Sequence, residues 1–368
     1  MRLFEATSGE IAIIDSVTHL VMRHLPLGVP SADWKHLYSI RGTALVDTDP
    51  ASGLTAATLQ LPGAYQLPAA TSSGLPGGTS PNAYWLVAQS YDGAATHFVI
   101  VGTSEMRIAH TANLTGHFNF DAISDDGERL YLIQYLNGRE YYVRLFNVLT
   151  SSLDENIVVD KSDGEQSMTG LRLSGIPTPG GSWLFSMYVR ESDNPFIHVL
   201  SLDGPFAFCL DLPGGGYASS DAERHWSLAM DRTGAEFYAV NVATGVVAQI
   251  DNSQLYNPQV KRTAHIWAGR PADVGSNAAV LSPDGRWLIA AGSSGVVWID
   301  TTTLAVRMQA LGGWHAWSLG LSPDGSQVYA VSDTGRIAGL DTATGRVISS
   351  FDTGVVRPMA LMRVVASA

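Results

Sequence analysis

Three histidines lie at nearly matching places in the chain, and imidazole is the side chain best suited to acid–base and metal chemistry near neutral pH. His117, His225 and His315 each come just before or at the start of an expected strand. Imidazoles that converge on one site could hold a divalent metal or serve as acid and base. The alternative is a structural role, in which the rings hydrogen-bond the ends of strands. No carboxylate recurs in the same register, so both interpretations stay open.

Local motifs of catalysis are missing from the sequence. It contains no Gly-rich phosphate loop, no Gly-x-Ser-x-Gly nucleophile elbow and no His-Glu-x-x-His metal motif. These absences count against hydrolases and nucleotide-dependent enzymes that depend on one such motif. They leave open an active site that is assembled from residues far apart in the sequence.

The elements that must position these residues are short strands joined by tight turns. β-Branched residues suit the pleated strands, and Gly and Asp suit turns that need positive φ. One unit makes a small four-stranded sheet, which would be marginally stable alone because its apolar faces have nothing to pack against. In the clearest unit the expected strands are His315–Leu321, Gln327–Val331, Arg336–Leu340 and Arg346–Phe351.

This unit recurs along nearly the whole chain of 368 residues, and internal repetition decides the architecture. We count about eight units, with seven as the alternative because the unit at Ser31–Pro62 has a shortened or missing first strand. The first unit also lacks its first strand, and the apolar segment Pro358–Val365 is expected to complete its sheet as a clasp. A Gly/Ser/Pro-rich insertion, Thr71–Pro81, is expected to be a surface loop.

The best-preserved units carry a Ser-Pro-Asp-Gly turn, a Val/Tyr/Ala-rich strand and a Thr-Gly turn, at Ser282–Asp300 and Ser322–Gly345. This pattern resembles the YVTN-type β-propeller repeats, in the broad group of lactonase-like propellers and the heavy chain of amine dehydrogenases. The resemblance implies an all-β fold, a β-propeller of four-stranded blades formed by residues 1–368 as a single domain. It says little about function, because such propellers serve as enzymes, subunits and binding platforms alike. The Gly-His and Trp-Asp pairs of WD40 repeats are not kept.

In the propellers that the chain resembles, the first strand of each blade lines a central channel. The three histidines would then lie at the channel mouth, with further polar and aromatic residues at similar depth. Together with Trp314, two of the tryptophans could form a platform for a sugar or peptide, although Trp also packs between blades. The candidate ligand-binding residues are His117, Asn119, His225, Trp226, Asn277, His315, Trp317 and Arg357, and the candidate metal ligands are the three histidines.

Composition limits the partners and the compartment. A formal net charge of -12 argues against nucleic acid and an anionic membrane surface as partners. No apolar run is long enough for a membrane-spanning helix. The single cysteine, Cys209, lies in an apolar run and is expected to be buried. The N-terminus lacks the apolar core of a signal peptide, which leaves two alternatives, a cytoplasmic protein or an exported one whose signal peptide has been removed.

These observations favour a non-catalytic propeller that binds a protein partner, as a scaffold or an accessory subunit, without a cofactor. The first alternative is an enzyme with lactonase- or lyase-like activity and a divalent metal near His117, His225 and His315. The second is a carbohydrate binder that uses the tryptophans at the channel mouth. A small-molecule ligand is compatible with each of these hypotheses.

Overall fold

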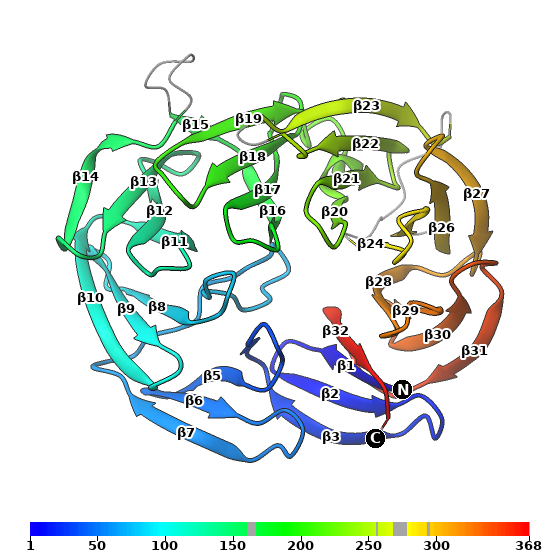
Figure 1. The fold of residues 1–368 in the computed structure, drawn as a ribbon, viewed down its shortest axis with the longest axis horizontal. Helices are drawn as coiled ribbons and strands as arrows, with labels where there is room; N and C mark the ends of the chain where they lie inside the picture. Colours follow the sequence, from blue (N-terminus) through cyan, green and yellow to red (C-terminus); the bar gives the residue numbers. More distant parts are fainter. Residues whose placement is uncertain (160–166, 255–256, 268–277, 293–294, 368) are drawn as a thin grey trace. The chain divides into compact units, whose positions relative to one another are not determined.

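Alternation of apolar and polar residues produces short antiparallel strands throughout the chain, as expected from the repeat (Figure 1). The computed structural model describes residues 1–159, 167–254, 257–267, 278–292 and 295–367. Within these ranges the strands form eight sheets, and the only helical element is a short 3-10 turn, η1 (Asp221–Arg224). The fold is therefore an all-β propeller, and the prediction of eight blades rather than seven is confirmed.

The chain divides into two compact units. Unit 1 comprises Met1–Leu27, Met187–Phe196 and Leu210–Ala368, and unit 2 comprises Gly28–Ser186 and Ile197–Cys209. The division passes through one sheet, whose strands are β16 (Leu171–Pro177), β17 (Trp183–Val189), β18 (Phe196–Ser201) and β19 (Ala207–Asp211).

Unit 1 contains four complete sheets of four strands each. In the first sheet, the C-terminal strand β32 pairs with β1 in antiparallel register, which confirms the expected clasp. That sheet consists of β1 (Arg2–Ala6), β2 (Glu10–Asp15), β3 (Val21–Pro26) and β32 (Ala360–Val365). The other three sheets are β20 (Trp226–Met230), β21 (Glu236–Asn241), β22 (Val246–Asp251) and β23 (Gln259–His265); β24 (Ala279–Leu281), β25 (Trp287–Gly292), β26 (Gly295–Asp300) and β27 (Ala305–Ala310); and β28 (Ala316–Leu321), β29 (Gln327–Ser332), β30 (Arg336–Asp341) and β31 (Val347–Asp352).

Unit 2 contains the less regular sheets, as the weaker repeat there predicts. The first strand of the Ser31–Pro62 unit is indeed short, because β4 has only two residues. Its sheet is β4 (Val29–Pro30), β5 (Leu37–Arg41), β6 (Ala44–Thr48) and β7 (Thr55–Gln60). The next two sheets have three and five strands, namely β8 (Trp85–Tyr91), β9 (Ala95–Gly102) and β10 (Arg107–Thr115), followed by β11 (Phe118–Ile123), β12 (Arg129–Tyr135), β13 (Glu140–Asn147), β14 (Ser152–Ile157) and β15 (Met168–Thr169).

The Ser-x-Asp-Gly turns owe their shape to one hydroxyl. Ser282 Oγ donates to Asp284 Oδ1 at 2.6 Å and accepts a hydrogen bond from the Trp287 backbone N–H at 2.9 Å. The turn is thus held by contacts that span only five residues, which explains why the motif is recognisable in the sequence. The same pair of contacts joins Ser31, Asp33 and His36; Ser124, Asp126 and Arg129; and Ser322, Asp324 and Gln327.

The glycine of this turn also permits close packing of successive units. Gly325 has a φ of +69°, and a Cβ at this position would lie 2.1 Å from Cγ of Pro283 in the preceding Ser-Pro-Asp-Gly turn. Any larger residue would strain the backbone and push the two turns apart.

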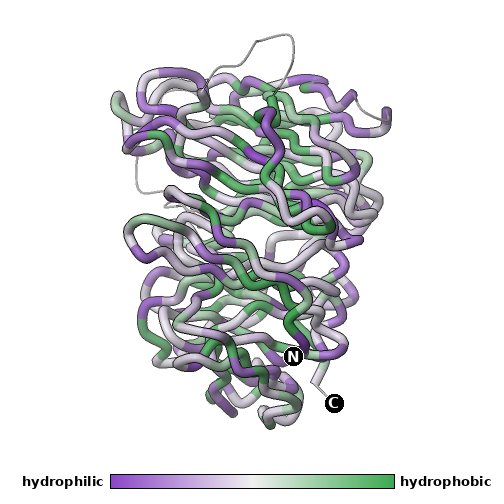
Figure 2. Tube along the Cα trace, turned by 90° about the vertical axis from the view of Figure 1, so that its left-hand side faces the viewer, coloured by the Kyte–Doolittle hydropathy of each residue, from purple (hydrophilic) through white to green (hydrophobic). Residues whose placement is uncertain are grey.

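The hydrophobic core is divided into clusters that lie between successive sheets. One cluster joins Trp287 and Trp298 of one sheet to Val328 and Leu340 of the next. In Figure 2 hydrophobic stretches alternate with hydrophilic ones along the trace. The sheets joined by such a cluster therefore depend on one another for burial of their faces, as in other repeat architectures.

The insertion at Thr71–Pro81 is not simply a surface loop, so that prediction was wrong. Gly77, Gly78 and Ser80 are buried. The Val87 N–H donates to the Gly78 carbonyl at 2.8 Å, and the Ser72 N–H donates to the Leu173 carbonyl at 2.8 Å. The Gly/Ser/Pro composition correctly indicated irregular backbone, but tertiary hydrogen bonds hold this backbone against β8 and β16.

Candidate functional site

The strongest candidate site is a cavity of about 240 Å³ whose lining residues all belong to unit 2. Two first strands, β11 and β16, supply part of its wall, and the 69–81 segment supplies most of the remainder. The lining residues are Val29, Ala69, Ala70, Pro76, Gly77, Gly78, Thr79, Ser80, Pro81, Phe120, Asp121, Ala122, Ile123, Arg172, Pro177, Leu184 and Leu202.

Two adjacent glycines shape the wall formed by the insertion. A Cβ on Gly77 would lie 2.8 Å from Cβ of Ala70. Gly78 has a φ of +105°, and a Cβ there would lie 2.6 Å from the Val87 carbonyl oxygen. Both positions therefore require glycine, because a side chain would strain the backbone or displace its neighbours.

A buried ion pair lies in the wall of the cavity. Nη1 of Arg172 on β16 is 3.4 Å from Oδ1 of Asp121 on β11. The Asp121 side chain is fully buried, whereas that of Arg172 is 21% exposed. A charge that is removed from water is costly unless it is paired and hydrogen-bonded. Both residues line the cavity, and Arg172 is the member of the pair that keeps accessible surface.

The hydrogen-bonding capacity of this pair is not filled by the protein. Over the residues that the structure describes, Asp121 Oδ1 and Oδ2, Arg172 Nε and the neighbouring Ser186 Oγ are buried and lack a hydrogen-bond partner. A Cβ on Gly175 would lie 2.7 Å from Arg172 Nη2 and 3.1 Å from Ser186 Oγ. Gly175 therefore leaves room for the guanidinium, and this cluster of buried polar groups adjoins the cavity wall through Asp121 and Arg172.

A buried histidine adjoins this cluster. His198 on β18 is 2% exposed, and desolvation lowers its pKa to about 4. Two smaller effects act on this pKa: the charge of Asp121 raises it and that of Arg172 lowers it. The imidazole is therefore neutral at pH 7. Its Nδ1 is 4.0 Å from Sγ of Cys209. Cys209 itself is exposed, so the prediction of a buried cysteine was wrong: β19 ends its sheet, and after Ala207 its residues are half-buried or exposed.

The sequence-predicted site residues of unit 2 form an exposed aromatic cluster. The His117 ring stacks on Tyr91, with centroids 4.6 Å apart, and lies 4.8 Å from the Tyr135 ring. Asn119 Nδ2 donates to the Tyr135 hydroxyl at 3.2 Å, and Asn119 Oδ1 accepts from Gln89 at 3.1 Å. These residues are held by one another, as expected for the structural role of His117.

The other predicted histidines lie in unit 1, each beside an aspartate. His225 Nε2 is 3.6 Å from Asp221 Oδ2, and His315 Nδ1 is 3.4 Å from Asp333 Oδ2. Neither carboxylate was predicted: Asp221 lies in the 3-10 turn just before His225, and Asp333 comes from the turn between β29 and β30. Within the described ranges no group of three or more His, Cys, Asp or Glu could hold a metal ion.

The remaining predicted residues differ in burial and do not share one site. Trp226 is fully buried, so its ring is not accessible to a ligand. Trp317 on β28 is half-buried, and Arg357 is exposed with a φ of +56°. Asn277 lies outside the described residues. The Trp314 ring is covered by the Arg336 guanidinium, 4.7 Å from its centroid.

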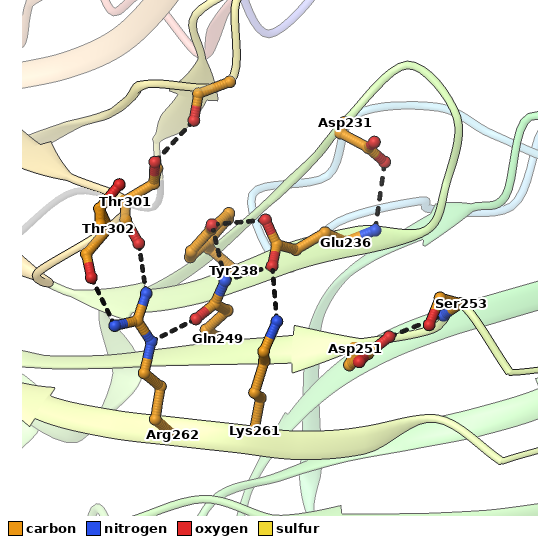
Figure 3. Close-up of polar contacts among 11 residues, drawn as sticks. Asp231, Glu236, Tyr238, Gln249, Asp251, Ser253, Lys261, Arg262, Thr301 and Thr302 are labelled. Atoms are coloured by element: carbon orange, nitrogen blue, oxygen red, sulfur yellow. Dashed lines mark hydrogen bonds and ion pairs between the residues drawn. The ribbon is translucent and has the colours of Figure 1, made fainter.

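A second polar cluster, in unit 1, differs from the cavity because its groups satisfy one another (Figure 3). Arg262 donates to the carbonyl oxygens of Thr302 and Thr301, at 2.6 and 2.5 Å, and to Gln249 Oε1. Gln249 in turn donates to the Tyr238 hydroxyl, at 3.1 Å, and to Glu236. This network joins β21, β22 and β23 to the turn after β26, which indicates a structural role.

The sequence did contain one signal for the cavity. Asp121 interrupts the apolar strand Phe118–Ile123, where a charged residue is unexpected at a buried position. Its partner Arg172 could not have been found in this way, because it lies on a different sheet.

Comparisons with known proteins support the fold. No family model matches the chain, and a search of curated proteins finds no match. Among solved structures, dihydro-heme d1 dehydrogenase NirN in complex with DHE has a TM-score of 0.57 at 13% identity, covering 98% of this chain and 73% of that chain. Hydrazine synthase of Kuenenia stuttgartiensis has a TM-score of 0.47 at 15% identity, covering 80% and 90%. A functionally unknown protein from Desulfotomaculum acetoxidans has a TM-score of 0.46 at 12% identity, covering 88% and 98%.

At 13% identity the likeness to NirN concerns the fold alone. The resemblance to YVTN repeats stays a prediction, whereas the β-propeller that it implied is confirmed. The described part of the chain has no helix long and apolar enough to cross a membrane.

Proposed function

We propose that this protein is a non-catalytic β-propeller that binds a small molecule in the cavity of unit 2, with Arg172 as the principal polar contact. The observation that carries the proposal is the Asp121–Arg172 ion pair: both residues line the cavity, with the Asp121 side chain fully buried and the Arg172 side chain 21% exposed. Buried charges with unfilled hydrogen-bonding capacity are costly to keep in a structure that needs only packing. Their place at a cavity wall supports a binding role.

The chemistry of the lining favours holding a ligand over transforming it. Ser80 Oγ, the buried hydroxyl of the lining, is engaged by Asn82 Oδ1 and by the Trp85 N–H, at 2.7 and 3.1 Å. A guanidinium cannot lose its proton near neutral pH, so Arg172 is suited to recognition rather than to proton transfer. The remaining wall is largely apolar and would bury the body of a ligand.

A fragment screen by thermal unfolding would test this proposal. A ligand that binds only the folded state at one hundred times its dissociation constant adds about 2.7 kcal/mol of stability. We expect fragments that raise the melting temperature of the native protein and lose this effect in the Arg172→Gln variant. Arg107→Gln is the matched control, because Arg107 forms an exposed ion pair with Glu105. Fragments that act equally on the native protein and on Arg172→Gln would contradict the proposal.

The Arg172→Gln variant alone leaves Asp121 as an unpaired buried charge and is therefore expected to be less stable. The double variant Asp121→Asn/Arg172→Gln removes both charges and tests ligand binding without this penalty. Loss of the ligand effect in the double variant at native-like stability would support a binding role for the pair.

The roles of scaffold or accessory subunit, expected from the sequence, stay predictions. They are compatible with a cavity ligand, which could adjust the surface that a protein partner meets. A metal-dependent enzyme built on His117, His225 and His315 and a carbohydrate binder also stay predictions. The cavity supports neither, because it contains none of the three histidines and no tryptophan.

A further inference from the structure

We infer that the ligand of the cavity is a compact organic monocarboxylate, whose carboxylate group is held by Arg172. This inference rests on the proposed function of the cavity and names its ligand class. It follows from three properties of the described residues: the sign of the accessible charge in the lining, the opposite charge that is paired with it, and the size and polarity of the remaining wall.

The sign of the charge selects an anion. Arg172 is the only cationic residue among those that line the cavity. The Arg172 side chain is 21% exposed, whereas that of Asp121 has no exposed surface. Arg172 is therefore the charged side chain of the lining that a ligand can reach. A planar guanidinium matches the two oxygens of a carboxylate, with which it forms charge-assisted hydrogen bonds.

The negative charge paired with Arg172 limits how negative the ligand can be. Asp121 Oδ1, at 3.4 Å from Nη1, already offsets much of the positive potential. A phosphate dianion carries two negative charges, which this single cation, already paired with Asp121, could not balance in a site of low polarity. A carboxylate carries one negative charge and is therefore less costly to bind, so we favour it over phosphate.

The size and polarity of the wall describe the body of the ligand. Phe120, Ile123, Leu184, Leu202 and Pro177 offer apolar surface to it. The volume of about 240 Å³ is below the range of about 300–1,000 Å³ for sites of drug-sized ligands. Benzoate and branched short-chain acids have suitable dimensions.

Isothermal titration at pH 7 with benzoate, its neutral isostere benzamide and inorganic phosphate would test the inference. We expect benzoate to bind the native protein and Arg107→Gln with equal affinity and 1:1 stoichiometry. We expect the affinity to fall at least tenfold in Arg172→Gln and in Asp121→Asn/Arg172→Gln. Asp121→Asn alone removes the competing negative charge, so it should strengthen benzoate binding severalfold.

A cavity-blocking variant locates the binding without changing a charge. Ala69 lines the cavity and is exposed, so Ala69→Trp should fold and occupy the space. Benzoate binding that persists in Ala69→Trp would overturn the inference. Gly175→Ala places a methyl group against Arg172 Nη2 and should also weaken benzoate, since the guanidinium must move.

The outcomes separate the ligand class from the proposed function. Benzamide that binds as well as benzoate, or phosphate that binds in place of both, would overturn the monocarboxylate class. If that binding is blocked by Ala69→Trp, the small-molecule function would stand. Failure of benzoate, of branched short-chain carboxylates and of every screened fragment to bind would overturn both.

Discussion

Replacement of Glu5 tests how much a buried carboxyl group lowers the stability of the protein. Glu5 lies on β1 opposite Ala12 of β2 and Leu361 of β32, and it is fully buried. Neither carboxyl oxygen has a hydrogen-bond partner in the described part of the chain. Desolvation raises the pKa of Glu5 from its usual value of 4.5 to about 8. The carboxyl group is therefore neutral in the folded protein at pH 7 and ionised in the unfolded chain.

The pKa difference sets the sign and the size of the effect. Because the folded state holds a proton that the unfolded chain releases, the free energy of unfolding falls as pH rises from about 4.5 to about 8. One pKa unit corresponds to about 1.4 kcal/mol, so Glu5 lowers stability by roughly 1 kcal/mol at pH 5 and by roughly 3 kcal/mol at pH 7. Glu5→Met keeps an unbranched side chain of similar size and removes the titrating group. We expect this variant to be more stable than the native protein at pH 7.

Urea unfolding of both proteins between pH 5 and pH 8 would measure the difference. Other groups titrate equally in both proteins, so only the difference between the two curves reports on Glu5. We expect this difference to grow by roughly 2 kcal/mol between pH 5 and pH 7. Glu5→Gln controls for the loss of the proton, and its difference from Glu5→Met should not vary with pH. A native-minus-Met difference that stays constant from pH 5 to pH 8 would refute the reasoning.

Three further predictions concern single side chains. Arg262→Met leaves the Thr301 and Thr302 carbonyl oxygens without their donor, which should cost about 1–3 kcal/mol in urea unfolding; an unchanged midpoint would contradict the structural role of the network. Cys209 is exposed and should react with one equivalent of a thiol reagent in the folded protein, whereas reaction only after denaturation would show that it is buried. Burial lowers the pKa of His198 to about 4, so the NMR signals of its ring should be those of a neutral imidazole down to about pH 5. The free energy of unfolding should fall as pH drops below 6.5, because the unfolded chain then binds a proton that the folded state does not. A His198 ring that titrates near pH 6.5 would contradict this prediction.

The fold was predictable because the repeat is written in local contacts. Ser282, Asp284 and Trp287 make their turn within five residues, and such contacts form in the same way wherever the motif occurs. The pairing of β32 with β1 was predictable too, since a first unit without its first strand requires a partner from elsewhere. The insertion at Thr71–Pro81 was misjudged, because composition reveals irregular backbone but not what it packs against.

The candidate site, unlike the fold, could not be predicted from the sequence. His117 was singled out for its register, yet its ring is held between Tyr91 and Tyr135. Asp121 and Arg172 attracted no attention, because neither belongs to a motif and each follows a different part of the repeat. Only the tertiary structure brings these charges, one on β11 and one on β16, within 3.4 Å of each other.

The sequence by itself determined the all-β repeat, the positions of most strands and the C-terminal clasp, because tight turns and alternating side chains act over a few residues. The tertiary structure alone decided which polar residues are buried and which of them meet. Burial and ion pairing depend on contacts between sheets, and the energies of Glu5, Asp121 and Arg172 are set by neighbours that are distant in the chain.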